Sequence, residues 1–128
     1  MILPLRFRTF WIGVTLLVAA IIVAGSLAPL RVMRVVTVWD KLQHAGSYCG
    51  LTLCCLGIVE RRAYLWAAGA ALLFGASMEV AQGTLTTTRV MDWHDLVANS
   101  TGIVAALACA YVGLGGWAQR VESLLRLR

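Results

Sequence analysis

The sequence predicts an all-α membrane protein, a bundle of four transmembrane helices with its N- and C-termini on the cytoplasmic side. Hydrophobic residues make up 60% of the 128 residues, only 13% are charged, and the mean hydropathy is +0.81. Soluble globular proteins do not carry that much apolar surface. The four apolar stretches are joined by connections too short for a separate soluble domain, and strand-like alternation is lacking. We therefore expect a single transmembrane domain over residues 1–128.

The first two predicted spans are residues 9–30 and 42–59. The first is free of charge over about 22 residues, enough to cross a bilayer, and Pro29 ends it. It also has the outline of a signal peptide, but the apolar region of such peptides is only about 7–15 residues long, which favours a retained helix. The second span holds one histidine, His44, and is closed by Glu60.

The last two predicted spans are residues 63–83 and 93–114. The third is free of charge up to Glu79, and glycines from Gly113 onward end the fourth. The tail over residues 117–128 has the spacing of an amphipathic helix, which predicts a helix lying on the membrane surface. The four cysteines fall within the spans and form no C-x-x-C pair, so they are predicted to be packing residues.

The basic residues predict the orientation of the spans. Seven Lys and Arg residues lie on the side of the termini and four on the other side, which places both termini in the cytoplasm. The net charge of +5 is scattered and forms no basic block. This distribution excludes nucleic acid as a partner and favours membrane lipids.

Three of the predicted helices carry a polar stripe at the end away from the termini. The stripes have i, i+3 or i, i+3, i+7 spacing and consist of Lys41, His44 and Tyr48, of Glu79 and Gln82, and of Asp92, Asp95 and Asn99. With a rise of 1.5 Å per residue, Glu79 lies roughly 24 Å into a hydrocarbon core of about 30 Å. Polar groups in hydrocarbon are unfavourable unless paired or hydrated, so the three stripes are predicted to converge.

The segments "DKLQHAGSY", "EVAQ" and "RVMDWHDLVANSTG" together resemble the VanZ-like family of small membrane proteins. The pattern of that family is D-K-x-x-H-x-x-x-Y, then E-x-x-Q, then R followed by D-x-x-x-N-x-x-G. The resemblance covers roughly residues 40–110, and the chain departs from it at "TLTTT", where a Pro-Gly type turn is expected. The matching residues are Asp40, Lys41, His44, Tyr48, Glu79, Gln82, Arg89, Asp95, Asn99 and Gly102.

The resemblance implies a multi-pass protein of the bacterial plasma membrane. The family takes its name from a member linked to teicoplanin resistance, and a relationship to enzymes acting on lipid head groups has been proposed. It therefore implies action on a lipid head group or a lipid-linked cell-envelope precursor at the outer face. The alternative is a non-catalytic envelope protein that binds lipid or alters access for glycopeptide antibiotics. A transporter is disfavoured because the polar residues cluster at one end.

The polar stripes contain the groups that such chemistry needs. A histidine flanked by carboxylates can act as general base or nucleophile, and Lys41 and Arg89 can clamp a phosphate. Glu79, Asp92 and Asp95 could also hold a divalent cation, but no established metal signature is present, so the prediction includes no metal or other cofactor. We predict catalytic roles for His44, Glu79 and Asp95, and substrate-binding roles for Asp40, Lys41, Tyr48, Gln82, Arg89, Asp92 and Asn99.

A purely structural interpretation stays open beside this one. Asp40, Lys41, Arg89 and the acidic residues could form mutual ion pairs that fix the helix register. Asp92 could be only an N-cap of the fourth helix, and Tyr48 and Asn99 could form interhelical hydrogen bonds. His94 lies outside the stripe and is predicted to play no part in the site.

Overall fold

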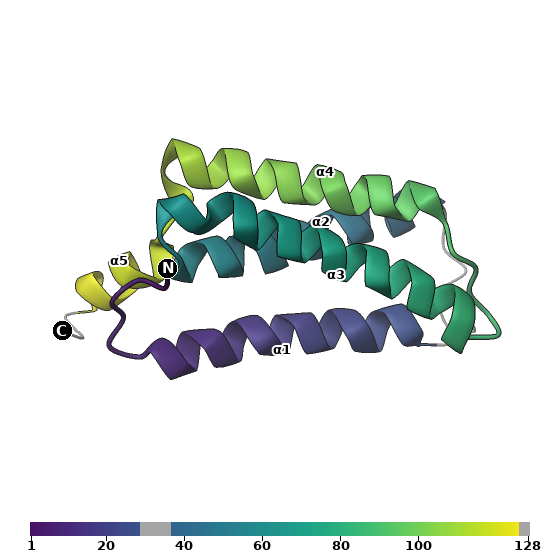
Figure 1. Ribbon diagram of the computed structural model, residues 1–128, viewed down its shortest axis with the longest axis horizontal. Coiled ribbons are helices and arrows are strands. Elements are labelled where there is room, and N and C mark those ends of the chain that lie inside the picture. Colours follow the sequence, from purple (N-terminus) through teal and green to yellow (C-terminus); the bar gives the residue numbers. More distant parts are fainter. Residues whose placement is uncertain (29–36, 126–128) are drawn as a thin grey trace.

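The computed structural model describes residues 1–28 and 37–125 of the chain, and Figure 1 shows their arrangement. Every element assigned in these ranges is helical, apart from an isolated antiparallel bridge between Ile2 and Val59. The elements are α1 (Arg8–Leu27), α2 (Thr37–Ile58), the short 3₁₀ helix η2 (Arg61–Ala63), α3 (Tyr64–Leu85), α4 (Trp93–Cys109), the π-helical turn η3 (Ala110–Leu114) and α5 (Trp117–Leu124).

Helix α2 lies at the centre of the packing. It contacts α1, α3, α4 and α5, and its main neighbour is α4 (Figure 1). Gly102 permits the close approach of these two helices, because the carbonyl oxygen of Ala45 occupies the space that a Cβ would need. Small residues at helix interfaces allow backbones to pack closely in this way. The face of α4 that carries Gly102 therefore packs directly against α2.

Two hydrophobic clusters fill the interior. One lies among α1, α2, α3 and α4 and consists of Ile22, Tyr48, Leu51, Ala68, Ala71 and Ile103. The other lies nearer the termini and consists of Leu56, Tyr64 and Ala110. The exposed faces of the long helices are also apolar, with Leu65, Leu73 and Val104 among their exposed residues. An apolar exterior around an apolar interior is what a lipid environment requires.

Three segments of the described chain are long and apolar enough to cross a membrane. They are Arg8–Leu27, Arg61–Leu85 and Trp93–Leu114, and they correspond to the first, third and fourth predicted spans. The first ends earlier than predicted, at Leu27, and residues 29–30 of that prediction lie outside the described residues. The fourth is α4 continued by η3, where Gly113 has a positive φ of 131°.

The second predicted span does not reach the apolarity of the other three. It coincides with α2, which is 22 residues long but starts at Thr37 and includes Asp40, Lys41 and His44 in its first turns. The physical reason is its central position, since the helices around it cover much of its surface. A helix shielded by protein needs fewer apolar side chains than one exposed to lipid.

Residues from both ends of the sequence meet at one end of the molecule. The carboxylate of Glu122, in α5, accepts hydrogen bonds from the backbone N–H of Arg6 at 2.9 Å, from that of Phe7 at 3.0 Å and from the Trp11 indole at 2.9 Å. Burial alone would raise the pKa of Glu122, but the hydrogen bonds from Phe7, Arg6 and Trp11 outweigh it and lower that pKa.

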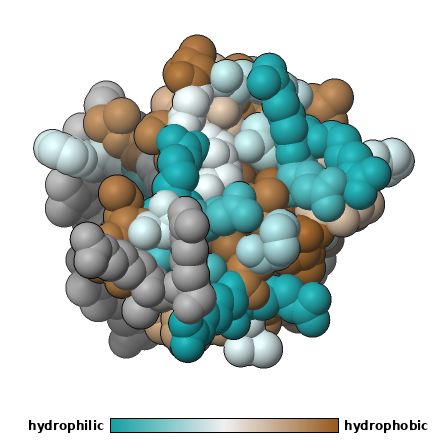
Figure 2. Space-filling view, turned by 90° about the vertical axis from the view of Figure 1, so that its left-hand side faces the viewer, coloured by the Kyte–Doolittle hydropathy of each residue, from teal (hydrophilic) through white to brown (hydrophobic). Residues whose placement is uncertain are grey.

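Helix α5 is more firmly attached than a helix that only lies on a surface. Ala118 and Glu122 are buried, and the Trp117 indole donates to the carbonyl oxygen of Leu53 in α2 at 2.9 Å. Its other face exposes Leu124 and Leu125, as predicted for the amphipathic tail. Residues 126–128 of that prediction lie outside the described residues. Figure 2 shows that hydrophilic side chains spread over this end of the molecule.

Candidate functional site

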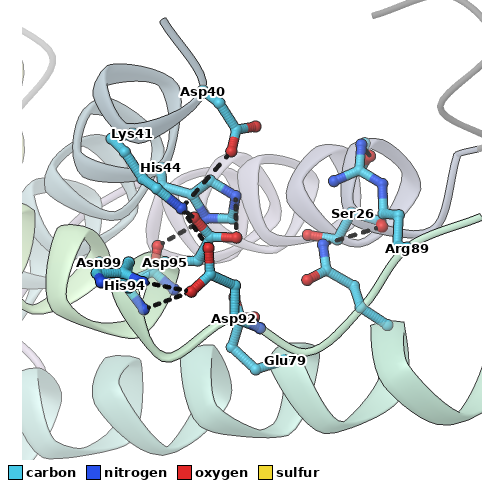
Figure 3. Close-up of polar contacts among 12 residues, drawn as sticks. Ser26, Asp40, Lys41, His44, Glu79, Arg89, Asp92, His94, Asp95 and Asn99 are labelled. Atoms are coloured by element: carbon cyan, nitrogen blue, oxygen red, sulfur yellow. Dashed lines mark hydrogen bonds and ion pairs between the residues drawn. The ribbon is translucent and has the colours of Figure 1, made fainter. Parts of the chain in front are cut away.

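The opposite end of the molecule carries a network of charged side chains on α2 and at the start of α4 (Figure 3). The Lys41 ammonium donates to Asp92 at 2.8 Å and also to Asp95. The Asp40 carboxylate lies 3.9 Å from the same ammonium nitrogen. Lys41 stands one turn into the start of α2, so it bridges the beginnings of two helices. The predicted convergence of the second and fourth helices occurs here.

Asp92 is both the N-cap of α4 and a partner of Lys41. Its Oδ1 accepts from the backbone N–H of His94 at 2.9 Å and lies 2.8 Å from the Nδ1 of the same residue. The hydrogen bond from Lys41, together with the backbone and side-chain hydrogen bonds from His94, holds the pKa of Asp92 well below its usual range. The capping role considered from the sequence is therefore present, and an ion pair accompanies it.

His94 contacts the edge of this network and stays near the solvent. Its ring stacks on that of Trp93 with the centroids 3.8 Å apart, and its side chain is 59% exposed. Among the described residues its side-chain hydrogen-bond partner is Asp92, and it does not line the cavity described below.

Both ring nitrogens of His44 face side chains of α4, and one of them is within hydrogen-bond distance. Nδ1 lies 3.0 Å from Oδ1 of Asn99, and Nε2 lies 3.6 Å from Oδ2 of Asp95. The side chain is only 11% exposed, and Asn99 is buried. The i, i+3 spacing of Lys41 and His44 lets one face of α2 meet both Asp95 and Asn99. This geometry fixes the imidazole and suits a general base, because one nitrogen is anchored while the other faces a carboxylate.

Glu79 joins the network through the backbone of Asp92. It is 4% exposed, and its Oε2 accepts the Asp92 N–H at 3.4 Å. Among the described residues no hydrogen bond links Glu79 to His44. The sequence left open whether Glu79 or Asp95 orients the histidine, and in the structure Asp95 and Asn99 are the side chains that face its ring nitrogens.

Gln82 and Arg89 point toward the end of α1. The Gln82 amide donates to the carbonyl oxygen of Ser26 at 3.1 Å, and Arg89 donates to those of Ala28 and Gly25, each at 3.3 Å. Figure 3 shows Arg89 lying apart from the acidic residues, beside Ser26. The last carbonyls of a helix lack partners within it, and a nearby cation is favourable there. Within the described chain, the ion pair with an acidic residue that was considered for Arg89 is replaced by these bonds to carbonyl oxygens.

The threonine-rich loop explains the direction of Arg89. The Thr86 hydroxyl donates to the carbonyl oxygen of Gln82 at 2.8 Å and accepts the backbone N–H of Arg89 at 3.1 Å. These bonds form where a Pro-Gly type turn was expected. They fold the start of the loop back onto α3, and the arginine side chain extends to α1.

A partly open cavity of about 160 Å³ lies between α1 and α2, with His44 in its wall. Apolar residues of α1 form one side and polar residues of α2 the other, with Arg89 at the edge. Its lining consists of Ile21, Ile22, Gly25, Ser26, Asp40, Gln43, His44, Ser47, Tyr48 and Arg89. The cavity thus brings together the predicted residues Asp40, His44, Tyr48 and Arg89, although they do not form one hydrogen-bonded network.

Three polar residues of the lining were missed from the sequence. Gln43 and Ser47 continue the spacing of Asp40 at i+3 and i+7, a second polar face on α2 that periodicity could have revealed. Ser26, near the end of α1, has no comparable signal. Tyr48 stands out within the cavity: it is 2% exposed, and its hydroxyl has no hydrogen-bond partner among the described residues.

One group of side chains has the composition and spacing of a metal site. Asp40, His44 and Asp95 each offer a ligand atom, and these atoms lie within 4.8 Å of one another. This is a different set from Glu79, Asp92 and Asp95, the carboxylates considered from the sequence. Among those three, Asp92 already bonds Lys41 and His94, while Glu79 accepts from the backbone.

Comparisons with known proteins add no relative. No family model matches the chain, no curated protein matches it, and no solved structure matches it. The resemblance to the VanZ-like family therefore remains a prediction that depends on the three sequence segments.

Proposed function

We propose that this chain is a VanZ-like protein of the bacterial plasma membrane that acts on a lipid head group or a lipid-linked cell-envelope precursor. In this proposal α1 to α4 all cross the membrane, α2 being the shielded fourth span. The termini are cytoplasmic, and the charged network and the cavity face outward. Membrane lipids are the partners, and a phosphorylated lipid is the substrate.

The distribution of basic residues supports this orientation. Exposed arginines gather at the end that carries the termini, namely Arg6, Arg8, Arg61, Arg62 and Arg120. The other end has Lys41 and Arg89 among its described residues, and both are engaged in bonds within the protein. Cytoplasmic ends of spans carry the excess of Lys and Arg.

The observation that carries the proposed activity is the setting of His44. Its two nitrogens face Asn99 and Asp95, and its ring forms part of a cavity wall. A histidine that only fixed helix packing would not need access to a cavity. A base anchored at one nitrogen beside a space for substrate is the usual arrangement for proton transfer.

The lining of the cavity favours an amphipathic ligand. Ile21 and Ile22 on α1 offer apolar contact for an acyl chain, while Asp40, Gln43 and Arg89 offer polar contact for a head group. An opening between two helices at the membrane boundary can be entered sideways from the lipid phase. A cavity with this lining and this opening suits a lipid better than a soluble metabolite.

The test is comparative profiling of lipids and envelope precursors in cells that lack the protein or express the wild type, His44→Gln or His94→Gln. Glutamine keeps hydrogen bonding but removes basicity. His94 is the matched control, because it is the other histidine of the chain and lies outside the cavity. Relative to cells that lack the protein, we expect the abundance of one lipid head-group class to change in cells that express the wild type or His94→Gln. In cells that express His44→Gln at an equal protein level, that abundance should match the cells that lack the protein. Profiles that never differ would overturn the proposal.

The second candidate, a non-catalytic envelope protein that binds lipid or alters glycopeptide access, has one observation in its favour. The two cations of the outer end that the structure describes already have partners within the protein. Lys41 pairs with carboxylates, and Arg89 donates to carbonyl oxygens. A network of this kind can stabilise a helix bundle without chemistry. Under this alternative His44→Gln keeps the antibiotic phenotype of the wild type, and no lipid head group changes.

A further inference from the structure

We propose that Asp40, His44 and Asp95 bind a divalent transition-metal ion of the kind that accepts mixed imidazole and carboxylate ligands, such as Zn²⁺ or Mn²⁺. This departs from the metal-free site predicted from the sequence. The role of the ion in the reaction rests on the proposed function. Binding of the ion can be measured by itself, without any lipid.

The distances suit such an ion. Ligand atoms about 2.1 Å from a tetrahedral metal lie roughly 3.4 Å from one another. Nε2 of His44 and Oδ2 of Asp95 are already 3.6 Å apart. The complete set lies within 4.8 Å, so one side chain must move by about an ångström. Asp40 is free to do so, because its side chain is 43% exposed and its nearest charged partner, Lys41, is 3.9 Å away.

The contacts of His44 favour a cation at this position over a direct bond. When Nδ1 donates to the Asn99 oxygen at 3.0 Å, Nε2 carries a lone pair and faces a carboxylate oxygen, which is also an acceptor. The 3.6 Å between Nε2 and Oδ2 is longer than a hydrogen bond and leaves room for an ion between the two atoms. Metal-binding histidines commonly donate their second ring N–H to an oxygen in this way.

The excess of negative charge in the cluster also favours a bound cation. Four carboxylates lie in the network, and Lys41 forms ion pairs with those of Asp40, Asp92 and Asp95. The fourth, Glu79, has the backbone N–H of Asp92 as its hydrogen-bond partner among the described residues. Lys41 contacts Asp92 and one oxygen of Asp95, which leaves the other oxygen of Asp95 toward His44. Charges away from water require partners, and a divalent ion reduces this excess of negative charge.

A separate observation indicates a ligand in the adjoining cavity. Tyr48 lines that cavity with Asp40 and His44, it is 2% exposed, and its hydroxyl has no partner within the described parts of the chain. Buried hydroxyls nearly always have a partner. Three protein ligands leave a coordination position for a water or substrate oxygen from this cavity.

The experiment is titration of the purified full-length protein in detergent, stripped with a chelator, with Zn²⁺ or Mn²⁺ alone. Isothermal calorimetry reports both ions, and the electron paramagnetic resonance spectrum of Mn²⁺ reports that ion independently. We expect one ion per chain for the wild type and for His94→Gln. We expect at least tenfold weaker binding for Asp40→Asn and His44→Gln.

Asp40→Asn keeps the test decisive even if His44→Gln fails to fold. Its side chain is 43% exposed and lies 3.9 Å from Lys41, so the variant should unfold at nearly the same temperature as the wild type. Absence of binding to the wild type, or binding that both substitutions leave unchanged, would overturn the proposal. A metal that binds without any head-group change would refute the proposed function alone, and a His44-dependent change in lipids without metal binding would refute this inference alone.

Discussion

Lys41 in the second turn of α2 bonds Asp95 in the first turn of α4, 54 residues later in the sequence. The same ammonium also bonds Asp92, immediately before α4 begins. One side chain therefore ties the starts of the two helices that have the most extensive contact in the molecule. The pairing places His44, one turn further along α2, beside Asp95 and Asn99, so the site geometry depends on this contact.

We predict that Asp95→Asn destabilises the protein far more than Asp92→Asn. Asp95 is 8% exposed and faces both Lys41 and His44, so its neutralisation leaves an ammonium without one partner and costs about 1–3 kcal/mol. Asp92 is more exposed, and asparagine caps a helix nearly as well, so we expect about 1 kcal/mol or less. Thermal unfolding in detergent measures both. The reverse order would mean that Asp92 holds the helices together.

Acidification should weaken the protein through Asp92. Its pKa in the folded protein lies below the ordinary value of 3.8, so the carboxylate binds protons less readily when folded than when unfolded. The stability from this shift is complete above pH 3.8 and is lost as the pH falls toward the lowered pKa. We therefore expect the unfolding temperature of the wild type to fall below about pH 4, and Asp92→Asn to lose less over that range. If the unfolding temperatures of the wild type and Asp92→Asn fall equally with pH, the lowered pKa of Asp92 is not the cause of the acid sensitivity.

Gly102→Ala should separate α2 from α4. A Cβ at this position meets the carbonyl of Ala45, which is backbone and cannot rotate away, so we expect a loss of about 1–3 kcal/mol. Gly69→Ala is the matched control, because nothing lies within 4 Å of a Cβ there and alanine favours the helix. Unfolding temperatures of the two variants compare them directly. A tolerated Gly102→Ala would show that the helices can move apart at little cost.

The proposed topology predicts the behaviour of reporter fusions. A reporter that is active only in the cytoplasm should work when fused to either terminus and fail when inserted near Thr86, in the loop between α3 and α4. Thr86 itself bonds Gln82, so the insertion belongs just after it, next to the exposed Thr87. Cytoplasmic activity at this loop would place the candidate site on the inner face and refute an outer-leaflet substrate.

Part of the candidate site could be predicted from spacing alone. Lys41 and His44 on one helix, and Asp95 and Asn99 on another, repeat at intervals that put each pair on one helix face. Polar helix faces in an apolar environment are favourable only when they contact one another. The structure joins these four residues through hydrogen bonds and ion pairs. Local periodicity was sufficient because both partners lie on regular helices.

Other features depend on geometry that no local pattern contains. Arg89 follows an irregular loop whose direction is set by two hydrogen bonds of the Thr86 hydroxyl, so its partners on α1 could not be read from spacing. The lower apolarity of α2 reflects how many neighbours it has, which is a property of the whole fold. The same holds for Glu122, whose partners lie more than a hundred residues away.

The bonds of Glu122 have a consequence for biosynthesis. Phe7 is the N-cap residue of α1 and has no side-chain hydrogen bond of its own to cap the helix, and the carboxylate that binds the backbone N–H groups of Arg6 and Phe7 comes from α5. The start of α1 therefore lacks this carboxylate until α5, more than a hundred residues later in the sequence, has been synthesised and has packed against it. The stability of the first helix is in this way coupled to the folding of the last described one.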